Sequence, residues 1–309
     1  MMKSCRTDDN CFLRIVLFCR HSILRRMKWI VIGANGMLGR DLVEEMKASH
    51  YEVVPLDLPE IDITQPPEEL EQHLPEADGL VNCAAYTKVD DAETERNAAF
   101  AVNAEGVYHL ALVALNREIP MVHVSTDYVF DGHGRRPYGE QDPVNPLNVY
   151  GASKLAGEKA LRSTGCPYLI VRTQSLFGKH GPNFVKAIAR KARESERPLK
   201  VVNDQFSAPT YTRHLANGIV RLMQAKAEGI VHVAAADSCS WFEFARQIVA
   251  EIQPGHVVIP IASEDMKRPA ARPKNSLLNM ERYQRLTGHM MPSWRSGLEA
   301  YFHEEDYFT

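Results

Sequence analysis

A glycine-rich loop joins an apolar segment to an amphipathic one near the start of the chain. Residues 28–32 read KWIVI, residues 33–39 read GANGMLG, and residues 40–49 carry apolar side chains at helical spacing. This order of strand, loop and helix predicts a nucleotide-binding unit: Gly33 permits the turn, Gly36 lets the backbone approach a pyrophosphate, and the last glycine allows close packing. The alternative, a plain glycine-bearing turn, is disfavoured by the fitting segments on both sides. We therefore expect cofactor contacts from Gly33, Gly36, Met37, Leu38 and Gly39.

The second expected strand ends in an acidic residue. Residues 51–56 are apolar enough for a buried strand, and Asp57 follows them. An acidic side chain about 20 residues beyond the loop can bind the adenosine ribose hydroxyls, and it would repel a 2′-phosphate. Asp57 therefore favours NADH slightly over NADPH, unless it caps a turn or basic side chains from elsewhere accommodate the phosphate. The expected cofactor is NADPH or NADH.

Expected strands and helices alternate along the rest of the chain. The strands are expected at 79–82, 121–124 and 230–234, and the helices at 97–115, 213–223 and 241–252. Such alternation predicts an α/β fold, with a Rossmann-type doubly wound parallel sheet and a smaller C-terminal substrate-binding lobe. We expect an extension at residues 1–26, an NAD(P)-binding domain at 27–175, and a substrate-binding lobe at 176–309 that is partly interleaved with it.

Small and hydroxyl-bearing residues follow two of these strands. Cys83, Ala84 and Ala85 would let a cofactor lie across a strand end, where open α/β sheets bind ligands, although small residues serve tight helix packing equally well. Ser125 and Thr126 end another strand, where their hydroxyls would either hold a substrate oxygen or form a turn.

Tyr150 and Lys154 stand four residues apart in NVYGASKLAGEKAL, which is typical of the start of a helix. Positions i and i+4 share one helix face, so the phenol and the ammonium can point into the same pocket. A nearby cation favours the phenolate and would lower the pKa of Tyr150, which makes it a proton donor or acceptor at neutral pH. Taken alone, such a pair also occurs by chance on solvated helices.

The composition indicates a cytoplasmic protein without a nucleic-acid or membrane partner. The chain has 309 residues, 45% of them hydrophobic, and a net charge of −3, which provides no basic surface for nucleic acid. No apolar run approaches the length that crosses a bilayer. The six cysteines show no CxxC or zinc-site spacing, as expected of reduced thiols in a cytosol. Residues 1–26 make a poor signal or transit peptide, so we expect folding to begin at Met27.

Several motifs together carry a family resemblance. GANGMLG, CAAYT, VSTDYVFDG, the run from PYGEQDP to ASKLAGE, and RTQSLFG resemble the dTDP-4-dehydrorhamnose reductase family of extended short-chain dehydrogenase/reductases. The similarity runs from about Met27 to near the end of the chain. It implies NAD(P)H-dependent reduction of a nucleotide-linked 4-keto-6-deoxy sugar, first of all dTDP-4-dehydrorhamnose to dTDP-L-rhamnose.

The resemblance also implies roles for individual residues. Tyr150 would donate a proton to the C4 oxygen, Lys154 would bind the nicotinamide ribose and lower the tyrosine pKa, and Thr126 would complete the catalytic set. Asp127 lies at a substrate-contact position. The remaining implied cofactor contacts are Asp62 and Ile63 on the adenine side, and Ala84, Ala85 and Tyr86.

Ser175 departs from the family pattern, which more often has a tryptophan that contacts the sugar nucleotide. The serine leaves a wider, more polar wall, so a reductase or epimerase of another sugar nucleotide stays open. A cofactor-binding regulatory protein like the β subunit of methionine adenosyltransferase stays open too. Arg268, Arg272 and Asn275 would meet a diphosphate or sugar, or form a basic surface loop. A homodimer is compatible with the family, and no carboxylate cluster places the magnesium ion that some bacterial members bind.

Overall fold

The computed structural model describes residues 26–304 and contains a six-stranded parallel sheet in the order β10-β5-β4-β3-β1-β2. The strands are β1 (Lys28–Ile32), β2 (Glu52–Leu56), β3 (Gly79–Asn82), β4 (Met121–Thr126), β5 (Tyr168–Thr173) and β10 (Gly229–His232). The chain order reverses between β1 and β3, which is the switch point of a doubly wound sheet and the usual place of a ligand crevice. The predicted fold class is therefore confirmed.

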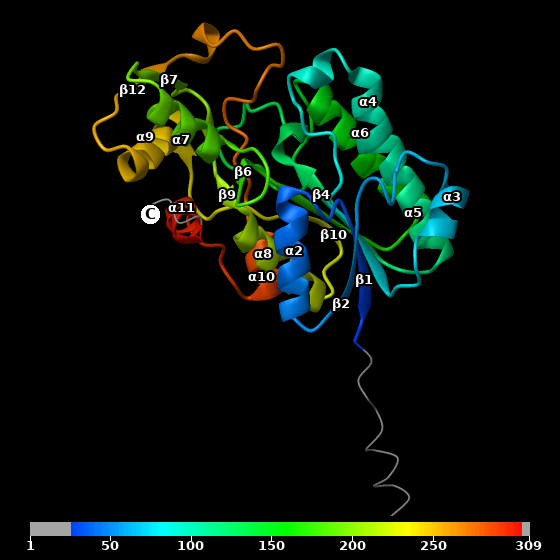
Figure 1. Ribbon diagram of the computed structural model, residues 1–309. Helices are drawn as coiled ribbons and strands as arrows, with labels where there is room; N and C mark the ends of the chain where they lie inside the picture. The colour runs from blue at the N-terminus through cyan, green and yellow to red at the C-terminus, as the bar shows by residue number, and fades with distance from the viewer. Residues whose placement is uncertain (1–25, 305–309) are drawn as a thin grey trace, which may run out of the picture.

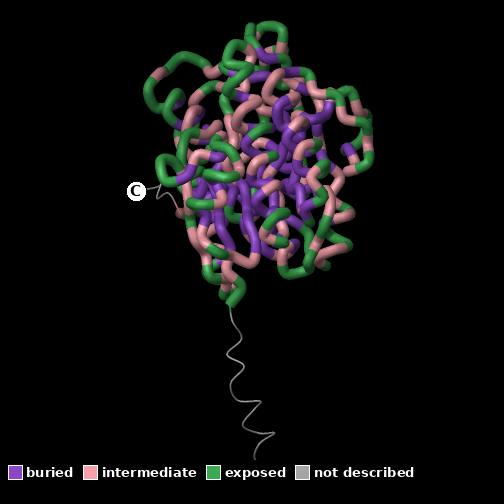
Figure 2. The backbone as a smooth tube through the Cα atoms, turned by 90° about the vertical axis from the view of Figure 1, so that its right-hand side faces the viewer, coloured by how far each residue is buried: buried purple, intermediate pink, exposed green. Residues whose placement is uncertain are grey.

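Alternating side chains of β1 enter two separate cores, one on each face of the sheet. Trp29 and Val31 pack with α2 (Met37–Ala48) and α8 (Thr212–Gln224), whereas Ile30 and Ile32 pack with α3 (Pro67–His73) and α5 (Gly106–Asn116). The remaining covering helices are α10 (Glu281–Thr287) on the first face and α6 (Val149–Thr164) on the second. Figure 1 shows the two helix groups on opposite sides of the sheet. In Figure 2 the buried residues concentrate in the interior, and the exposed ones lie mostly at the periphery.

The predicted burial of residues 51–56 was wrong. β2 pairs with β1 alone and is the edge strand, and its Glu52 and Pro55 are exposed. An edge strand tolerates a proline because one of its sides makes no ladder hydrogen bonds.

The helix expected at 97–115 forms, with an irregularity in its middle. α4 (Arg96–Phe100) runs through a π-helical segment (Ala101–Glu105) into α5. Within the described residues, Arg96–Asn116 is long and apolar enough to cross a membrane by length and composition alone, so the statement that no such run exists was wrong. Half of it is buried inside the protein, where α5 packs on α3 and α6, and a buried core helix passes the same test.

A third, aromatic core lies beside the sheet. It is formed by α7 (Phe184–Glu194), α9 (Trp241–Ile252) and α11 (Trp294–Glu304), with a two-stranded parallel sheet of β7 (Leu199–Val202) and β12 (Val258–Ile261). Two short strand pairs complete it: β6 (Leu176–Phe177) with β9 (Thr210–Tyr211), and β8 (Phe206–Ser207) with β11 (Cys239–Ser240). Between these segments the chain returns to the large sheet through α8, β10 and α10, so it passes several times between the large sheet and the aromatic core (Figure 1).

Candidate active site

The carboxyl ends of the central parallel strands meet at one edge of the sheet and bring the predicted site residues together. Gly33 follows β1 with φ 75°, and a Cβ there would lie 2.5 Å from the backbone nitrogen of Ala84, which follows β3. Likewise, a Cβ on Gly39 would lie 2.1 Å from the Gly33 carbonyl oxygen. Only glycine fits these close approaches of backbone to backbone.

The glycine loop leaves backbone donors available at the start of α2. Its N-cap is Gly36, no side chain caps the helix, and the first turn, which includes Met37 and Leu38, carries no acidic residue. The first N–H groups of a helix have no partner within the helix, and they favour a phosphate. The residues present therefore fit the pyrophosphate of a dinucleotide.

Asp57 holds the loop from the neighbouring strand. One carboxylate oxygen accepts from the Asn35 N–H at 2.7 Å, and the other accepts from the Leu58 N–H at 2.8 Å. The Arg40 guanidinium donates to the Asn35 carbonyl at 3.1 Å. Asp57 therefore caps the turn, as the alternative interpretation of this residue predicted. The basic side chain of Arg40 lies beside the same loop.

Asp62 and Ile63 lie on the α5 side of the sheet. Asp62 accepts two hydrogen bonds from Thr64, and the Ile63 side chain is buried against Gly106. Their side chains are therefore engaged in a turn and in the core.

The segment after β3 is clamped by a buried asparagine that the sequence reasoning missed. Asn103 Oδ1 accepts from the Tyr86 N–H at 2.8 Å, and its Nδ2 donates to the Tyr86 carbonyl at 3.0 Å and to Ser153 Oγ on α6 at 2.9 Å. The Tyr86 phenol itself donates to Glu95. Asn103 lies in the π-helical segment, a distortion that often marks functional sites. The available signal was a polar side chain, Asn103, in the middle of an apolar helical stretch.

Tyr150 and Thr126 come together at the end of β4. α6 begins here because Asn148 caps it, accepting from the Gly151 N–H at 2.7 Å. A Cβ on Gly151 would lie 2.2 Å from the Tyr128 carbonyl, so the helix start presses against the end of β4. Burial raises the pKa of Tyr150 to about 12, while its hydrogen bond with Thr126 lowers the pKa and the Asp127 charge raises it.

The expected lowering of the Tyr150 pKa by Lys154 was wrong. Lys154 Nζ donates to the Val124 carbonyl at 2.7 Å and lies 3.3 Å from His123 Nε2. The amine is thus directed at β4, although it shares a helix face with the tyrosine. Burial lowers the pKa of Lys154 to about 8, opposed by the Glu158 and Cys83 charges.

Asp127 joins the sheet edge to a distant segment. Burial raises the pKa of its carboxyl to about 7, and hydrogen bonds from Ser276 and Thr126 oppose this shift. Gln174, with its amide oriented to satisfy both partners, donates to the Ser276 carbonyl at 3.0 Å and accepts from the Ala208 N–H at 2.9 Å. Sequence reasoning missed Ser276 and Gln174.

Ser175 follows β5 at the same edge of the sheet. It adopts φ 50°, which is uncommon outside glycine, and its hydroxyl is hydrogen-bonded to that of Ser207. The serine hydroxyl is therefore paired with a hydroxyl from another part of the chain.

A buried ion pair lies behind the site. Arg172 donates to both oxygens of Glu158, at 2.9 and 2.6 Å, and Ser125 Oγ donates to the same carboxylate at 2.6 Å. Glu158 follows Lys154 by one turn of α6, so this cluster fixes that helix against β4 and β5.

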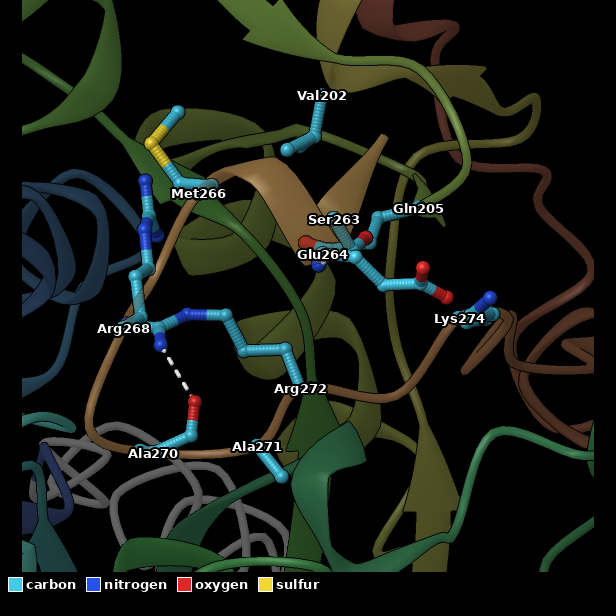
Figure 3. Close-up of a pocket in the computed structure, with 10 residues that line it drawn as sticks. All are labelled: Val202, Gln205, Ser263, Glu264, Met266, Arg268, Ala270, Ala271, Arg272 and Lys274. Carbon is cyan, nitrogen blue, oxygen red and sulfur yellow. Dashed lines mark hydrogen bonds between the residues drawn. The ribbon is translucent and has the colours of Figure 1, made fainter. Parts of the chain in front are cut away.

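A pocket of about 200 Å³ opens beside the site on the basic loop (Figure 3). Arg272 forms a two-point ion pair with Asp90, at 2.9 and 2.8 Å, whereas Arg268 has no hydrogen-bond or ion-pair partner within residues 26–304. Both arginine charges act on Tyr128, whose ring makes an edge contact with Tyr150 at 5.8 Å. Asn275, in contrast, donates to the Gly134 carbonyl and does not line the pocket. The pocket lining is Val202, Gln205, Ser263, Glu264, Met266, Arg268, Ala270, Ala271, Arg272 and Lys274.

No group of three or more metal-ligating side chains occurs among the described residues. Cys83, Cys166 and Cys239 are free thiols. The other three cysteines and nearly all of the expected N-terminal extension lie outside the described residues.

A doubly wound sheet with a glycine loop after β1 and a Tyr–Lys helix beside β4 defines the fold of an extended short-chain dehydrogenase/reductase. The family model "RmlD substrate binding domain" matches residues 27–307, and the chain belongs to this family. The predicted resemblance is thereby confirmed.

Relatives of this chain carry reductase names. The chain is 41% identical over 288 residues to the dTDP-4-dehydrorhamnose reductase of Burkholderia thailandensis, covering 87% of this chain and 96% of the relative. It is 37% identical over 284 residues to the dTDP-4-keto-6-deoxy-D-glucose reductase of Streptomyces niveus, covering 89% of this chain and 96% of the relative. The crystal structure of dTDP-4-dehydrorhamnose reductase from Bacillus anthracis in complex with NADP superimposes with a TM-score of 0.86 at 40% identity, covering 90% of this chain and 99% of that one.

Proposed function

We propose that this protein is an NADPH-dependent reductase of a dTDP-linked 4-keto-6-deoxy sugar, and that its first substrate is dTDP-4-dehydrorhamnose, giving dTDP-L-rhamnose. The observation that carries the proposal is the placement of Tyr150 and Thr126 together at the carboxyl end of β4, at the same edge of the sheet as the glycine loop after β1. The reductases named above share both the keto-sugar class and the fold.

The proposed reaction needs a proton donor and a positioned ketone. A bound nicotinamide, held by the loop from Gly33 to Gly39 and the segment from Ala84 to Tyr86, would supply the hydride. Tyr150 keeps its proton at neutral pH because its pKa is raised, so it can donate that proton to the C4 oxygen as negative charge develops there. The Thr126 hydroxyl donates its proton to Asp127 and can accept from the phenol, which would orient Tyr150.

Arg268 supports a nucleotide-linked substrate. Arg268 and Arg272 both line the pocket, and burial together with the Arg272 charge lowers the pKa of Arg268 (Figure 3). A cation that has no ion-pair partner in residues 26–304 favours an anionic ligand. We propose that Arg268 meets the diphosphate of the sugar nucleotide, and that Ser175 and Ser207 face the sugar.

NADPH is compatible with the loop although Asp57 favours NADH. Both Asp57 oxygens already accept backbone N–H groups, which leaves the carboxylate less available to a ribose, and Arg40 adds a positive charge beside the loop. We therefore propose that the protein uses NADPH and also accepts NADH.

Absorbance of NADPH and NADH in the presence of enzymatically generated dTDP-4-dehydrorhamnose tests the proposal. We expect rapid oxidation, and we expect Tyr150→Phe to reduce turnover by about 10²-fold or more while it leaves cofactor binding unchanged. Undiminished turnover in Tyr150→Phe would contradict the role of the tyrosine. Cofactor binding without oxidation would favour another sugar nucleotide or a regulatory role, and co-purification of a stoichiometric enzyme partner would favour the regulatory role.

Location and assembly follow from the same proposal. A biosynthetic reductase of this kind would act in the cytoplasm on a nucleotide sugar, without a nucleic-acid or membrane partner. The homodimer stays a prediction, which analytical ultracentrifugation tests.

A further inference from the structure

Three buried polar side chains form a row behind Tyr150. Asn82 at the end of β3 and His123 in β4 are register partners on neighbouring strands, and Lys154 reaches them from α6. The two strand residues are fully buried, and Lys154 is 2% exposed. Asn82 Nδ2 lies 3.3 Å from His123 Nδ1, and His123 Nε2 lies 3.3 Å from Lys154 Nζ.

A backbone amide fixes the direction of the hydrogen bonds in this row. The Ala84 N–H donates to Asn82 Oδ1 at 3.0 Å, and because an N–H can only donate, the amide oxygen faces Ala84 and the NH₂ group faces His123. Nδ1 of His123 must therefore accept. Burial holds the pKa of His123 well below its usual value, so the ring is neutral. With Nδ1 accepting, the ring carries its proton on Nε2 and directs it at Lys154.

Every hydrogen-bond donor in this row finds an acceptor only when Lys154 is a neutral amine. An ammonium group would face the Nε2–H as a second donor, and neither group could accept. A neutral amine accepts the Nε2–H through its lone pair and still donates to the Val124 carbonyl at 2.7 Å. Leaving a buried donor without an acceptor costs about 1–3 kcal/mol, so the row favours the neutral amine.

We propose that His123, oriented by Asn82, is a positioning residue that stabilises the neutral amine of Lys154 over the ammonium and thereby sets the pH at which Lys154 titrates. The other ionisable groups facing Lys154 are Glu158 on its own helix and Cys83 after β3, and both oppose the effect of burial on its pKa.

The tautomer of His123 is measurable without any substrate. Nitrogen NMR of full-length, ¹⁵N-histidine-labelled protein, assigned with His123→Gln, should show the proton on Nε2 at pH 7. A proton on Nδ1 would overturn the proposal. The effect of Lys154 on kcat rests on the proposed reductase function, whereas the tautomer does not, so the failure of one is distinguishable from the failure of the other.

Asn82→Asp tests the consequence for Lys154. An aspartate of the same shape still accepts from the Ala84 N–H, but it also accepts from the ring, which moves the proton to Nδ1 and lets Nε2 accept from the ammonium. We expect the pH at which Lys154 titrates to rise by at least about one unit, a tenfold change in proton affinity. The readouts are ¹³Cε-lysine NMR and, in the active enzyme, the alkaline limb of kcat.

A surface substitution provides the control for the added charge. Asn116→Asp places the same carboxylate at the exposed end of α5 and should leave both readouts unchanged. An unshifted Lys154 titration in folded Asn82→Asp, with folding checked by its thermal transition, would overturn the proposal. If the variant turns over no substrate, the NMR titration decides alone.

Discussion

The two walls of the candidate site are built differently. On the cofactor side, the glycine loop, the segment after β3 and Lys154 are held by backbone contacts or by buried side chains such as Asn103. On the substrate side, Arg268 has no ion-pair partner in the described chain, and the nearby Lys274 is 62% exposed with a loose pair to Asp204 at 3.5 Å. The cofactor wall is held in place by the fold, whereas the substrate wall is lined by exposed charged side chains.

This difference suggests how one scaffold accepts different sugars. A constant ligand, such as a dinucleotide, rewards a preorganised surface, because little conformational freedom is lost on binding. A surface of exposed charges can be altered with little effect on the fold, since surface substitutions usually change stability by less than about 0.5 kcal/mol. Changes on the cofactor wall should therefore affect folding and binding together, and changes on the substrate wall should affect substrate binding alone.

Gly33→Ala should give the largest effect of such changes. The added Cβ would lie 2.5 Å from the Ala84 backbone nitrogen, so backbone must move in addition to adopting an unfavourable positive φ. We expect unfolding free energy to fall by about 2–4 kcal/mol and cofactor affinity to fall at least about tenfold. Denaturant unfolding and calorimetric titration with NADPH measure the two effects.

Gly165→Ala is the matched control for this substitution. Gly165 ends α6 with φ 81° and has no atom within 4 Å of its added Cβ, so only the cost of the positive φ remains, about 1–2 kcal/mol. Equal losses in the two variants would mean that the approach to Ala84 does not constrain the loop, and the contrast between the walls would be lost.

Arg268→Ala should act on substrate binding only. Losing a charge-assisted hydrogen bond to a diphosphate should raise KM for the dTDP sugar by about tenfold, with kcat and thermal stability little changed. Steady-state kinetics measures this, and Lys267→Ala removes the neighbouring exposed charge as a control. A similar KM increase in both variants would indicate a general electrostatic effect in place of a diphosphate contact.

The sequence predicts the cofactor wall better than the substrate wall because the first is locally encoded. A strand, a glycine loop and a helix follow one another within a few residues, and Tyr150 and Lys154 lie one helical turn apart. The contacts of Asp127 with Ser276 and of Ser175 with Ser207 join residues 149 and 32 positions apart, and no local pattern announces them.

Two of the wrong predictions, the burial of residues 51–56 and the lowered pKa of Tyr150, have the same origin. Whether residues 51–56 are buried depends on the order of strands in the sheet. The apolar composition of the segment does not show whether the strand lies at the edge of the sheet. Whether Lys154 lowers the pKa of Tyr150 depends on where its amine points, which β4 decides through Val124 and His123. Helical spacing places two side chains on one face, but it does not choose their partners.

Asp127 connects the cofactor wall and the substrate wall. The pH dependence of its carboxyl therefore tests how the two walls are joined. Its carboxyl is buried at the end of β4 and accepts from Ser276 of the substrate wall. Since its pKa is raised to about 7 from an ordinary value of 3.8, the folded protein binds more protons than the unfolded chain between these values. By linkage, stability from this group is largest below about pH 4 and is lost as pH rises through about 7.

Asp127→Asn removes this dependence because the amide does not ionise. We expect the fall in Tm between pH 5.5 and pH 8 to be smaller in the variant than in the parent by about 4–8 °C, the change that about 2 kcal/mol makes in a protein somewhat smaller than this one. All other titrating groups are common to both proteins and cancel in the difference. Parallel curves of Tm against pH would show that the carboxyl is ionised throughout, and the junction between the walls would then hold a buried charge.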